Sequence, residues 1–366
     1  MKRFQQILTL ILTFGFLVIF SVLFLITPDS DESQTERRPL AKRPALSFSS
    51  VANGSFMNSF EKYLLDQFPL RNSFRTLKAF TATKVFMQKD NNGLFSAGEH
   101  LSKLDFPTNL SSVDYAARRF RFVYDTYLKN SGAKTYLSVI PDKNTFLTSQ
   151  NGYPDKDYKA LVKRLQDRFP QAKYIDISKM LSADDFYYTD SHWRQEKILK
   201  VADEIVKKMG AEPIGKCEMH DTGIPFYGVY YGQSALPHAS EPLRYLNNFV
   251  IRSLRVYNVE TASEIPVYDL KAAAGRDPYE MFLGGARSII SLTNPNAKHK
   301  RKLLVFRDSF GSSIAPLLAA GYSEITLVDI RYISPLSLSK FVDFSGVTDV
   351  LFLYSASVVN NSETIK

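Results

Sequence analysis

The sequence predicts an α/β protein with a mostly parallel sheet, helices on both faces of that sheet, and a membrane-spanning helix at the N-terminus. Strand-like and helix-like segments alternate from about residue 115 onward, which is the pattern of a parallel sheet. Several strand-like segments are short unbroken apolar runs, as in strands buried on both faces. A third observation, an uncharged apolar run near the N-terminus, predicts the membrane span.

That apolar run covers residues 7–26 and is long enough to cross a bilayer. Lys2 and Arg3 precede it, and this positive flank predicts a cytoplasmic N-terminus. A cleaved signal peptide is the alternative, but it would have a shorter apolar region and a small-x-small site, whereas Thr27 and Pro28 follow here. We therefore favour a single-pass anchor in the cell membrane over residues 1–28, and then an extracytoplasmic polar tether over residues 29–50.

Residues 51–366 are predicted to form one α/β domain, interrupted by a β-rich insertion at about residues 220–270. Its first helix opens at about residue 60 and breaks at Pro69. Helices are predicted over residues 72–84, 115–131, 158–169, 194–209 and 335–344, and another begins at residue 314. Strands are predicted over residues 135–140, 173–177, 303–306, 324–328 and 350–354.

Composition excludes several classes of protein. The 45% hydrophobic and 23% charged content is that of a folded globular chain. The net charge is +9, but Lys and Arg are scattered without a nucleic-acid-binding motif, so an anionic envelope or polysaccharide surface fits better than nucleic acid. Cys217 is the only cysteine, and the five histidines form no i,i+4 pair and no H-E-x-x-H motif. We therefore predict no disulfide, no metal and no other cofactor.

A serine at the end of a predicted strand is the first candidate for chemistry. The strand 303–306 is followed by the polar residues Arg307, Asp308 and Ser309, then by Gly311, which allows a tight turn into a helix. A serine in such a turn has an exposed hydroxyl beside the backbone N–H groups of a helix N-terminus, where an oxyanion would be stabilised. This strand–turn–helix arrangement around a serine is that of a nucleophile elbow, although the G-x-S-x-G motif is absent. The alternative is that Ser309 caps the helix.

An acid–base pair is the second candidate. Asp190 and His192 lie two residues apart, and such residues project to the same side of an extended segment. A carboxylate beside a histidine fixes the tautomer of the imidazole and stabilises its protonated form. The alternative is a loop histidine with an ordinary local partner. Together with Ser309, the pair supplies a nucleophile, a base and an orienting acid.

Six short motifs occur in consistent order, at residues 36–41, 66–71, 140–143, 188–193, 282–285 and 307–310. Together they resemble the DHHW protein family of bacteria, which is related to the AlgX and AlgJ alginate O-acetylation proteins and has an SGNH-hydrolase-like domain. One position departs from the family pattern: Ser191 stands where the family often has its first histidine, between Asp190 and His192.

The resemblance implies a three-layer, flavodoxin-like SGNH sheet with the motif order permuted relative to ordinary SGNH hydrolases. It implies a triad in which Ser309 attacks an acyl donor, His192 takes the serine proton and Asp190 orients His192. An acetyl-serine intermediate would then pass its acetyl group to a sugar hydroxyl.

The resemblance also implies the surroundings of this triad. The oxyanion would be bound by the Ser309 N–H and by a backbone N–H near Gly284 and Gly285, and Arg307 is a further candidate there. Tyr188 and Trp193, with Tyr187, would line a sugar groove. Asp142 and Lys143, in the 140–143 motif at a strand end, are interpreted as ending the strand, and a part in the site is the alternative.

The expected function is therefore extracytoplasmic O-acetylation of a cell-surface or exported polysaccharide. The resemblance implies a partner, a membrane-bound O-acyltransferase that brings acetyl groups across the bilayer. An acetylesterase stays open, because water and sugar compete for the same acyl-enzyme. The alternative from a different class is a non-catalytic protein that binds polysaccharide or forms the scaffold of an envelope complex.

Overall fold

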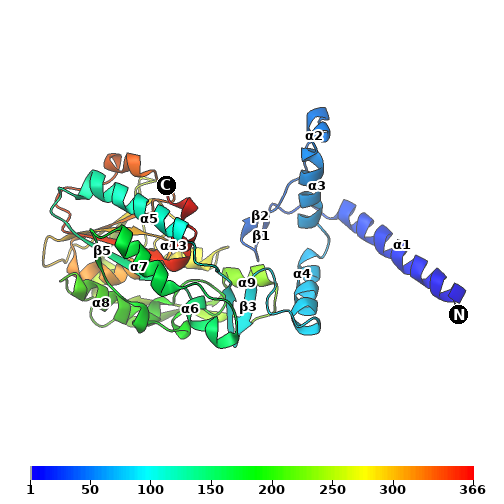
Figure 1. Cartoon of the computed structure of the whole chain (residues 1–366), viewed down its shortest axis with the longest axis horizontal. Helices are drawn as coiled ribbons and strands as arrows, with labels where there is room; N and C mark the ends of the chain where they lie inside the picture. Colours follow the sequence, from blue (N-terminus) through cyan, green and yellow to red (C-terminus); the bar gives the residue numbers. More distant parts are fainter. Residues whose placement is uncertain (1) are drawn as a thin grey trace. The chain divides into compact units, whose positions relative to one another are not determined.

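The computed structural model describes residues 2–366, which divide into two compact units (Figure 1). The first unit comprises the chain up to Asn92 together with Tyr231–His238. The second unit comprises Gly93–Tyr230 and Ala239–Lys366. Residues 51–92, which the sequence grouped with the α/β domain, thus belong to the same unit as the N-terminal helix.

The first unit is built of helices. The longest helix, α1 (Lys2–Ile26), is long and apolar enough to span a membrane, and it is the one such helix among residues 2–366. As predicted, a helix ends shortly before Pro69. The other elements of this unit are α2 (Phe48–Ala52), α3 (Ser55–Asp66), α4 (Arg71–Phe80), the π-helical turn Thr81–Val85, β1 (Glu32–Ser33) and β2 (Arg38–Pro39).

Residues 29–41, within the segment predicted as a tether, make hydrogen bonds to α3 and to the residue after it. Arg38 pairs with Asp66 at 2.5 Å, and this hydrogen bond lowers the pKa of Asp66 to about 2. Glu36 pairs with Arg71 at 2.5 Å and with Arg75 at 3.2 Å. The 36–41 and 66–71 motifs therefore form one ion-pair network, which explains their presence without a role in chemistry.

The second unit has the predicted α/β fold. Its eight-stranded sheet has the order β10-β9-β11-β13-β12-β14-β5-β6. The five neighbouring strands β13, β12, β14, β5 and β6 are parallel to one another. The pairs β13–β11, β11–β9 and β9–β10 are antiparallel. The strands are β5 (Lys134–Ile140), β6 (Lys173–Tyr174), β9 (Arg255–Asn258), β10 (Ser263–Ile265), β11 (Ile289–Thr293), β12 (Lys302–Arg307), β13 (Glu324–Val328) and β14 (Asp349–Ser355).

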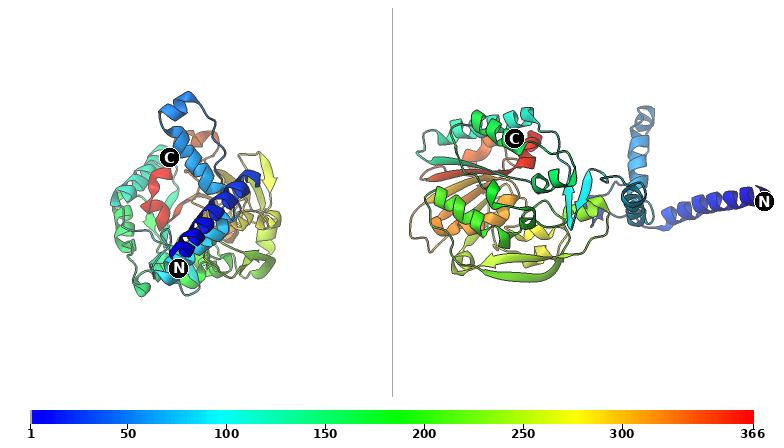
Figure 2. Two further views of the ribbon diagram at one scale, coloured as in Figure 1. Left: turned by 90° about the vertical axis from the view of Figure 1, so that its right-hand side faces the viewer. Right: turned by 60° about the horizontal axis from the view of Figure 1, so that its bottom comes forward.

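Helices cover both faces of this sheet, which makes three layers (Figure 2). One core lies beneath α5 (Leu110–Val123), α7 (Tyr158–Arg168) and α13 (Ala356–Asn360). The other lies beneath α8 (Leu199–Lys208) and α12 (Phe310–Ile314), which continues as the 3₁₀ helix Ala315–Gly321. Successive β12 residues alternate between the two cores, because side chains of a strand alternate between its faces.

The segment predicted as a β-rich insertion is divided between two sheets. Its first part forms an antiparallel pair, β7 (Glu218–Phe226) and β8 (Glu241–Asn247), whereas β9 and β10 extend the main sheet as its antiparallel edge. A further pair is β3 (Leu94–Ala97) and β4 (His100–Lys103). The short helices are α6 (Asn144–Leu147), α9 (Val229–Ser234), α10 (Phe249–Ser253) and α11 (Leu270–Ala273).

Candidate active site

Ser309 lies in the sharp turn between β12 and α12, at the carboxyl end of a central strand. Among the described residues its side chain makes no capping hydrogen bond to α12. Asp308 does the capping instead: its buried carboxylate accepts from the N–H of Phe310 at 3.1 Å and from the N–H of Ser355 at 2.7 Å. The interpretation of Ser309 as a mere cap is therefore wrong, and its hydroxyl is left for another contact.

That contact is His192. The Oγ atom of Ser309 lies 2.7 Å from Nε2 of His192, and Nδ1 of His192 lies 2.6 Å from Oδ1 of Asp190. With its Nδ1–H donated to the carboxylate, the imidazole presents the Nε2 lone pair to the serine hydroxyl. Asp190 is buried, whereas the side chain of His192 is 16% exposed. The nucleophile and base face accessible space while the acid is shielded from it.

The imidazole ring is fixed from its sides as well. Tyr279 stacks on it with ring centroids 4.0 Å apart and planes at 15°, and Phe310 contacts it at 4.9 Å. The Tyr279 hydroxyl donates to Ser313 Oγ at 2.7 Å, which orients the tyrosine. Sequence reasoning missed Tyr279, because nothing in its local pattern distinguishes it from the many other aromatic residues.

The loop that carries Asp190 and His192 is held by a buried lysine. The Nζ of Lys143 donates to the carbonyl oxygens of Tyr187, Tyr188 and Asp190 at 2.8, 2.9 and 2.8 Å. Burial lowers the pKa of Lys143 to about 7, although the charges of Asp190 and Glu241 act to raise it. Lys143 thus positions the loop that carries Asp190 and His192, which is more than the strand-ending role that the sequence suggested.

Glu241 and Gly228 hold the same loop from its other side. The Glu241 carboxylate accepts from the N–H groups of Tyr188 at 2.9 Å and Thr189 at 3.1 Å. Burial raises the pKa of Glu241, and these two hydrogen bonds oppose that shift. A Cβ atom at Gly228 would overlap the Thr189 carbonyl and the Asp190 side chain, so only glycine permits this approach. Sequence reasoning missed both residues, which lie about 40 to 50 positions away.

Two of the predicted substrate contacts are wrong. Trp193 is 0% exposed, and its indole N–H donates to Ser313 Oγ at 2.8 Å, so it cannot stack on a sugar. Tyr187 is equally buried. Tyr188 is partly exposed, and its role in binding sugar stays a prediction.

Arg307 is the other correction. It is 0% exposed, and its guanidinium lies 3.9 Å from the carboxylate of Asp329, which also pairs with Arg331 at 2.7 Å. Burial lowers the pKa of Arg307, and the Asp329 charge opposes that shift. A Cβ atom at Gly311 would lie 2.6 Å from the Arg307 Cβ, so Gly311 is needed for this packing and not for a turn. Arg307 supports the turn from beneath and does not face substrate.

Gly284 and Gly285 have φ of 70° and 75°, the left-handed region that favours glycine. The Gly285 N–H donates to the Phe282 carbonyl at 3.1 Å, and the Gly285 carbonyl lies 3.4 Å from Ser312 Oγ. The Gly285 N–H is thus already engaged in a turn.

Across residues 2–366, no group of three His, Cys, Asp or Glu side chains is arranged to hold a metal ion.

Comparison with solved structures identifies the fold. A DHHW family protein from Eubacterium siraeum superimposes with a TM-score of 0.61 at 18% identity, covering 75% of this chain and 95% of that chain. The chain has the fold of a DHHW family protein. Bacillus cereus PatB1 with a sulfonyl adduct gives 0.58 at 18% identity, covering 73% and 97% of the two chains. The O-acetyltransferase domain of Pseudomonas putida AlgJ gives 0.46 at 12% identity, covering 73% and 92%.

The predicted resemblance is therefore confirmed at the level of fold. Sequence comparisons add nothing to it, since no family model and no curated protein sequence matches the chain.

Proposed function

We propose that this protein is an extracytoplasmic O-acetyltransferase of a cell-surface or exported polysaccharide, acting through an acyl-serine intermediate. The observation that carries the proposal is the continuous contact from Ser309 Oγ to His192 Nε2, at 2.7 Å, and from His192 Nδ1 to Asp190, at 2.6 Å. A serine, a histidine and a carboxylate in this arrangement are equipped for acyl transfer.

In the first half-reaction Ser309 Oγ attacks the carbonyl carbon of the acetyl donor while its proton moves to His192 Nε2. Asp190 stabilises the resulting imidazolium, and the Ser309 N–H at the start of α12 is the proposed oxyanion donor. Collapse of the tetrahedral intermediate breaks the bond to the leaving group, which takes the proton from His192. The product is acetyl-Ser309.

In the second half-reaction a sugar hydroxyl gives its proton to His192 and attacks the acetyl-serine. Collapse breaks the bond between the acetyl group and Ser309 Oγ, and the serine recovers its proton from His192. No step needs a metal or an organic cofactor. Water in place of the sugar makes the same protein an acetylesterase.

The length and apolar character of α1 support membrane anchoring. With Lys2 and Arg3 at its start, the proposed orientation has a cytoplasmic N-terminus and a site outside the cytoplasm. The proposed partners are the polysaccharide acceptor and a membrane-bound O-acyltransferase that supplies acetyl groups across the bilayer.

A sulfonyl reagent offers the sharpest test, because PatB1, which shares this fold, carries a sulfonyl adduct in one structure. The full chain in detergent is treated with phenylmethylsulfonyl fluoride or p-nitrophenyl acetate, and peptides are analysed by mass spectrometry. We expect an adduct on the Ser309 peptide that is lost in Ser309→Ala. Ser191→Ala is the matched control, because Ser191 lies beside the triad but its Oγ is 3.4 Å from Asp190 and is not joined to His192.

The fate of the acetyl group then separates the alternatives. Transfer to an added oligosaccharide supports an acetyltransferase, whereas rapid loss to water with acceptor present supports an acetylesterase. A folded protein that is modified equally in Ser309→Ala, or not at all, would favour the non-catalytic scaffold and contradict the proposal.

A further inference from the structure

The first unit exposes apolar side chains at a density unlike that of the second. Outside α1, residues 46–87 hold at least as many exposed large apolar side chains as the whole of the second unit, which is several times longer. Soluble surfaces rarely carry such a concentration unless something covers it. These side chains are Leu46, Phe48, Val51, Met57, Leu65, Leu70, Leu77, Phe80, Val85, Phe86 and Met87.

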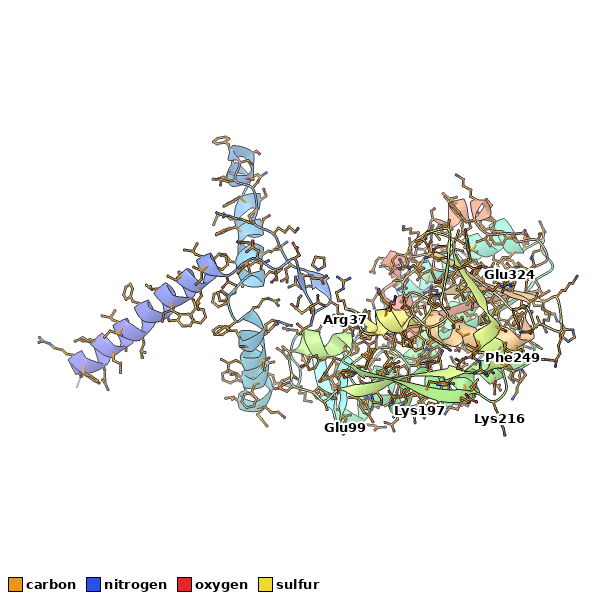
Figure 3. All side chains as sticks on the ribbon, turned by 180° about the vertical axis from the view of Figure 1, so that it is seen from behind. Arg37, Glu99, Lys197, Lys216, Phe249 and Glu324 are labelled. Carbon is orange, nitrogen blue, oxygen red and sulfur yellow. The ribbon has the colours of Figure 1, made fainter. Side chains whose placement is uncertain are left out.

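The membrane helix itself indicates what covers them. Near its C-terminal end, Phe20 of α1 contacts the rings of Phe68 and Phe74, each at 5.4 Å, and Phe24 contacts Tyr63 at 5.6 Å. The helix α1 runs crosswise to α3 and α4 (Figures 1 and 3). A helix that crosses a membrane therefore has α3 and α4 lying across its end, in the direction of the membrane plane.

The depth of this contact follows from helix geometry. Phe20 precedes the end of α1 at Ile26 by six residues, or about 9 Å at 1.5 Å per residue. Residues that touch Phe20 then lie about that far inside the boundary between the hydrocarbon and the headgroups, within the roughly 5–10 Å to which the apolar face of an interfacial helix is buried. Phe68 and Phe74 are both placed at that depth.

The side chains around Phe74 suit this boundary. Leu77 falls on the same side of α4 as Phe74, with Arg71 and Lys78 beside them. The exposed Leu70 immediately precedes the helix as its N-cap residue. Asn72 lies on the opposite side. Apolar residues flanked by cations are the pattern of a helix that lies in the interface of an anionic bilayer.

A groove next to this face is likewise lined by both apolar and cationic side chains. Its volume is about 330 Å³, and Leu65, Phe68 and Phe74 supply its apolar walls. Lys78, Arg71 and Arg75 also line it. Arg71 pairs with Glu36 and Asp66, and Arg75 pairs with Glu36. The Nζ of Lys78 donates to the neutral amide oxygen of Asn92 at 2.9 Å, so Lys78 keeps its charge for a phosphate.

We propose that α3 and α4 lie flat in the headgroup region of a phospholipid bilayer, on the side of the membrane where α1 ends. Leu70, Phe74 and Leu77 face the acyl chains, and Lys78 faces lipid phosphates. The chain then has a second membrane contact besides its span. This inference rests on the membrane anchoring within the proposed function, but not on the acetyl-transfer chemistry.

The test places a fluorescent probe at chosen depths in the full chain. The Cys217→Ser protein is reconstituted in nanodiscs of phosphatidylethanolamine and phosphatidylglycerol, with one NBD-labelled cysteine at a time. Leu77→Cys probes the proposed lipid face of α4, and Leu77 is 58% exposed, so the change leaves packing intact. Asn72→Cys, about 140° away around the same helix, is the matched control. Leu12→Cys reports on α1.

We expect the probe at residue 77 to emit at shorter wavelength than at residue 72, to be quenched by lipid-attached nitroxides and to be protected from aqueous iodide. If residue 12 is in lipid but residue 77 behaves like residue 72, the inference is overturned while the anchor stands. Protection of residue 77 from both quenchers means that protein covers it, which also overturns the inference. If residue 12 is reached by iodide, the proposed anchor fails and the inference fails with it.

Discussion

The two arms of the candidate site are held by different kinds of contact. Ser309 follows a central strand of the sheet, and the residue before it, Asp308, caps the helix that follows. His192 lies instead on a loop whose position depends on Lys143 and Glu241, side chains from distant parts of the chain. The serine arm is thus fixed by its own sequence and by regular structure, and the histidine arm by buried polar contacts over long sequence separations. Changes at those contacts should disturb the base without moving the nucleophile.

The largest expected effect comes from the histidine arm itself. Asp190→Asn keeps the side-chain shape but removes the negative charge and replaces one of the two acceptor oxygens by an NH2 donor, so the tautomer of His192 is no longer fixed. We expect acylation of Ser309 by p-nitrophenyl acetate to slow by about 10²- to 10⁴-fold, measured from nitrophenol release in a single turnover. The melting temperature should stay close to that of wild type. An unchanged rate would mean that Asp190 has no part in acyl transfer.

Lys143→Met should come next, because it leaves three buried carbonyl groups without their donor. We expect the free energy of unfolding to fall by about 2–4 kcal/mol, measured with denaturant, and the acylation rate to fall by about 10-fold or more as the loop loosens. The control is Lys163→Met, at a side chain that is 75% exposed; this change should stay within about 0.5 kcal/mol. Equal effects of the two substitutions would remove Lys143 from its positioning role.

The same lysine predicts a pH dependence of stability. Burial lowers the pKa of Lys143 in the folded state from 10.5 to about 7. Between these pH values the unfolded chain binds more protons than the folded chain, so this group makes the free energy of unfolding rise with pH. The stability difference between wild type and Lys143→Met should therefore grow across that window. A constant difference would show that the amine is not titrating there.

A smaller effect is expected from the close approach at Gly228. In Gly228→Ala the new methyl group meets the Thr189 carbonyl and the Asp190 side chain, so the loop must shift. We expect a loss of about 1–3 kcal/mol in the free energy of unfolding, together with slower acylation. Gly275→Ala is the control. Its added Cβ would lie 3.0 Å from the Ala272 carbonyl oxygen, and its three nearest neighbouring atoms all belong to Ala272, so the acylation rate should stay unchanged.

Tyr279→Phe should have the smallest effect. It removes the hydroxyl that donates to Ser313 but keeps the ring that stacks on His192. Because Ser313 still accepts from Trp193, we expect a loss of only about 1 kcal/mol by thermal unfolding. A loss of activity as large as that of Asp190→Asn would instead give the hydroxyl a direct part in the reaction.

The sequence alone predicted the features that depend on neighbouring residues. The alternation of strands and helices, the turn that holds Ser309 and the apolar α1 helix are all visible in short stretches of chain. The pairing of Asp190 with His192 was predictable for the same reason, since the two residues are two positions apart. Each of these features forms because of the order of residue types within one short segment.

Only the tertiary structure decided which of the polar and aromatic candidates face the site. Trp193 and Arg307 are buried, and Asp308 caps the helix in place of Ser309. Lys143 and Glu241, which are distant from the histidine loop in sequence, hold it through direct hydrogen bonds. Burial and long-range hydrogen bonds depend on which segments the fold brings together, and single-sequence periodicity does not contain that information. The sequence therefore supplied the reactive groups, and the packing of distant segments determined their geometry.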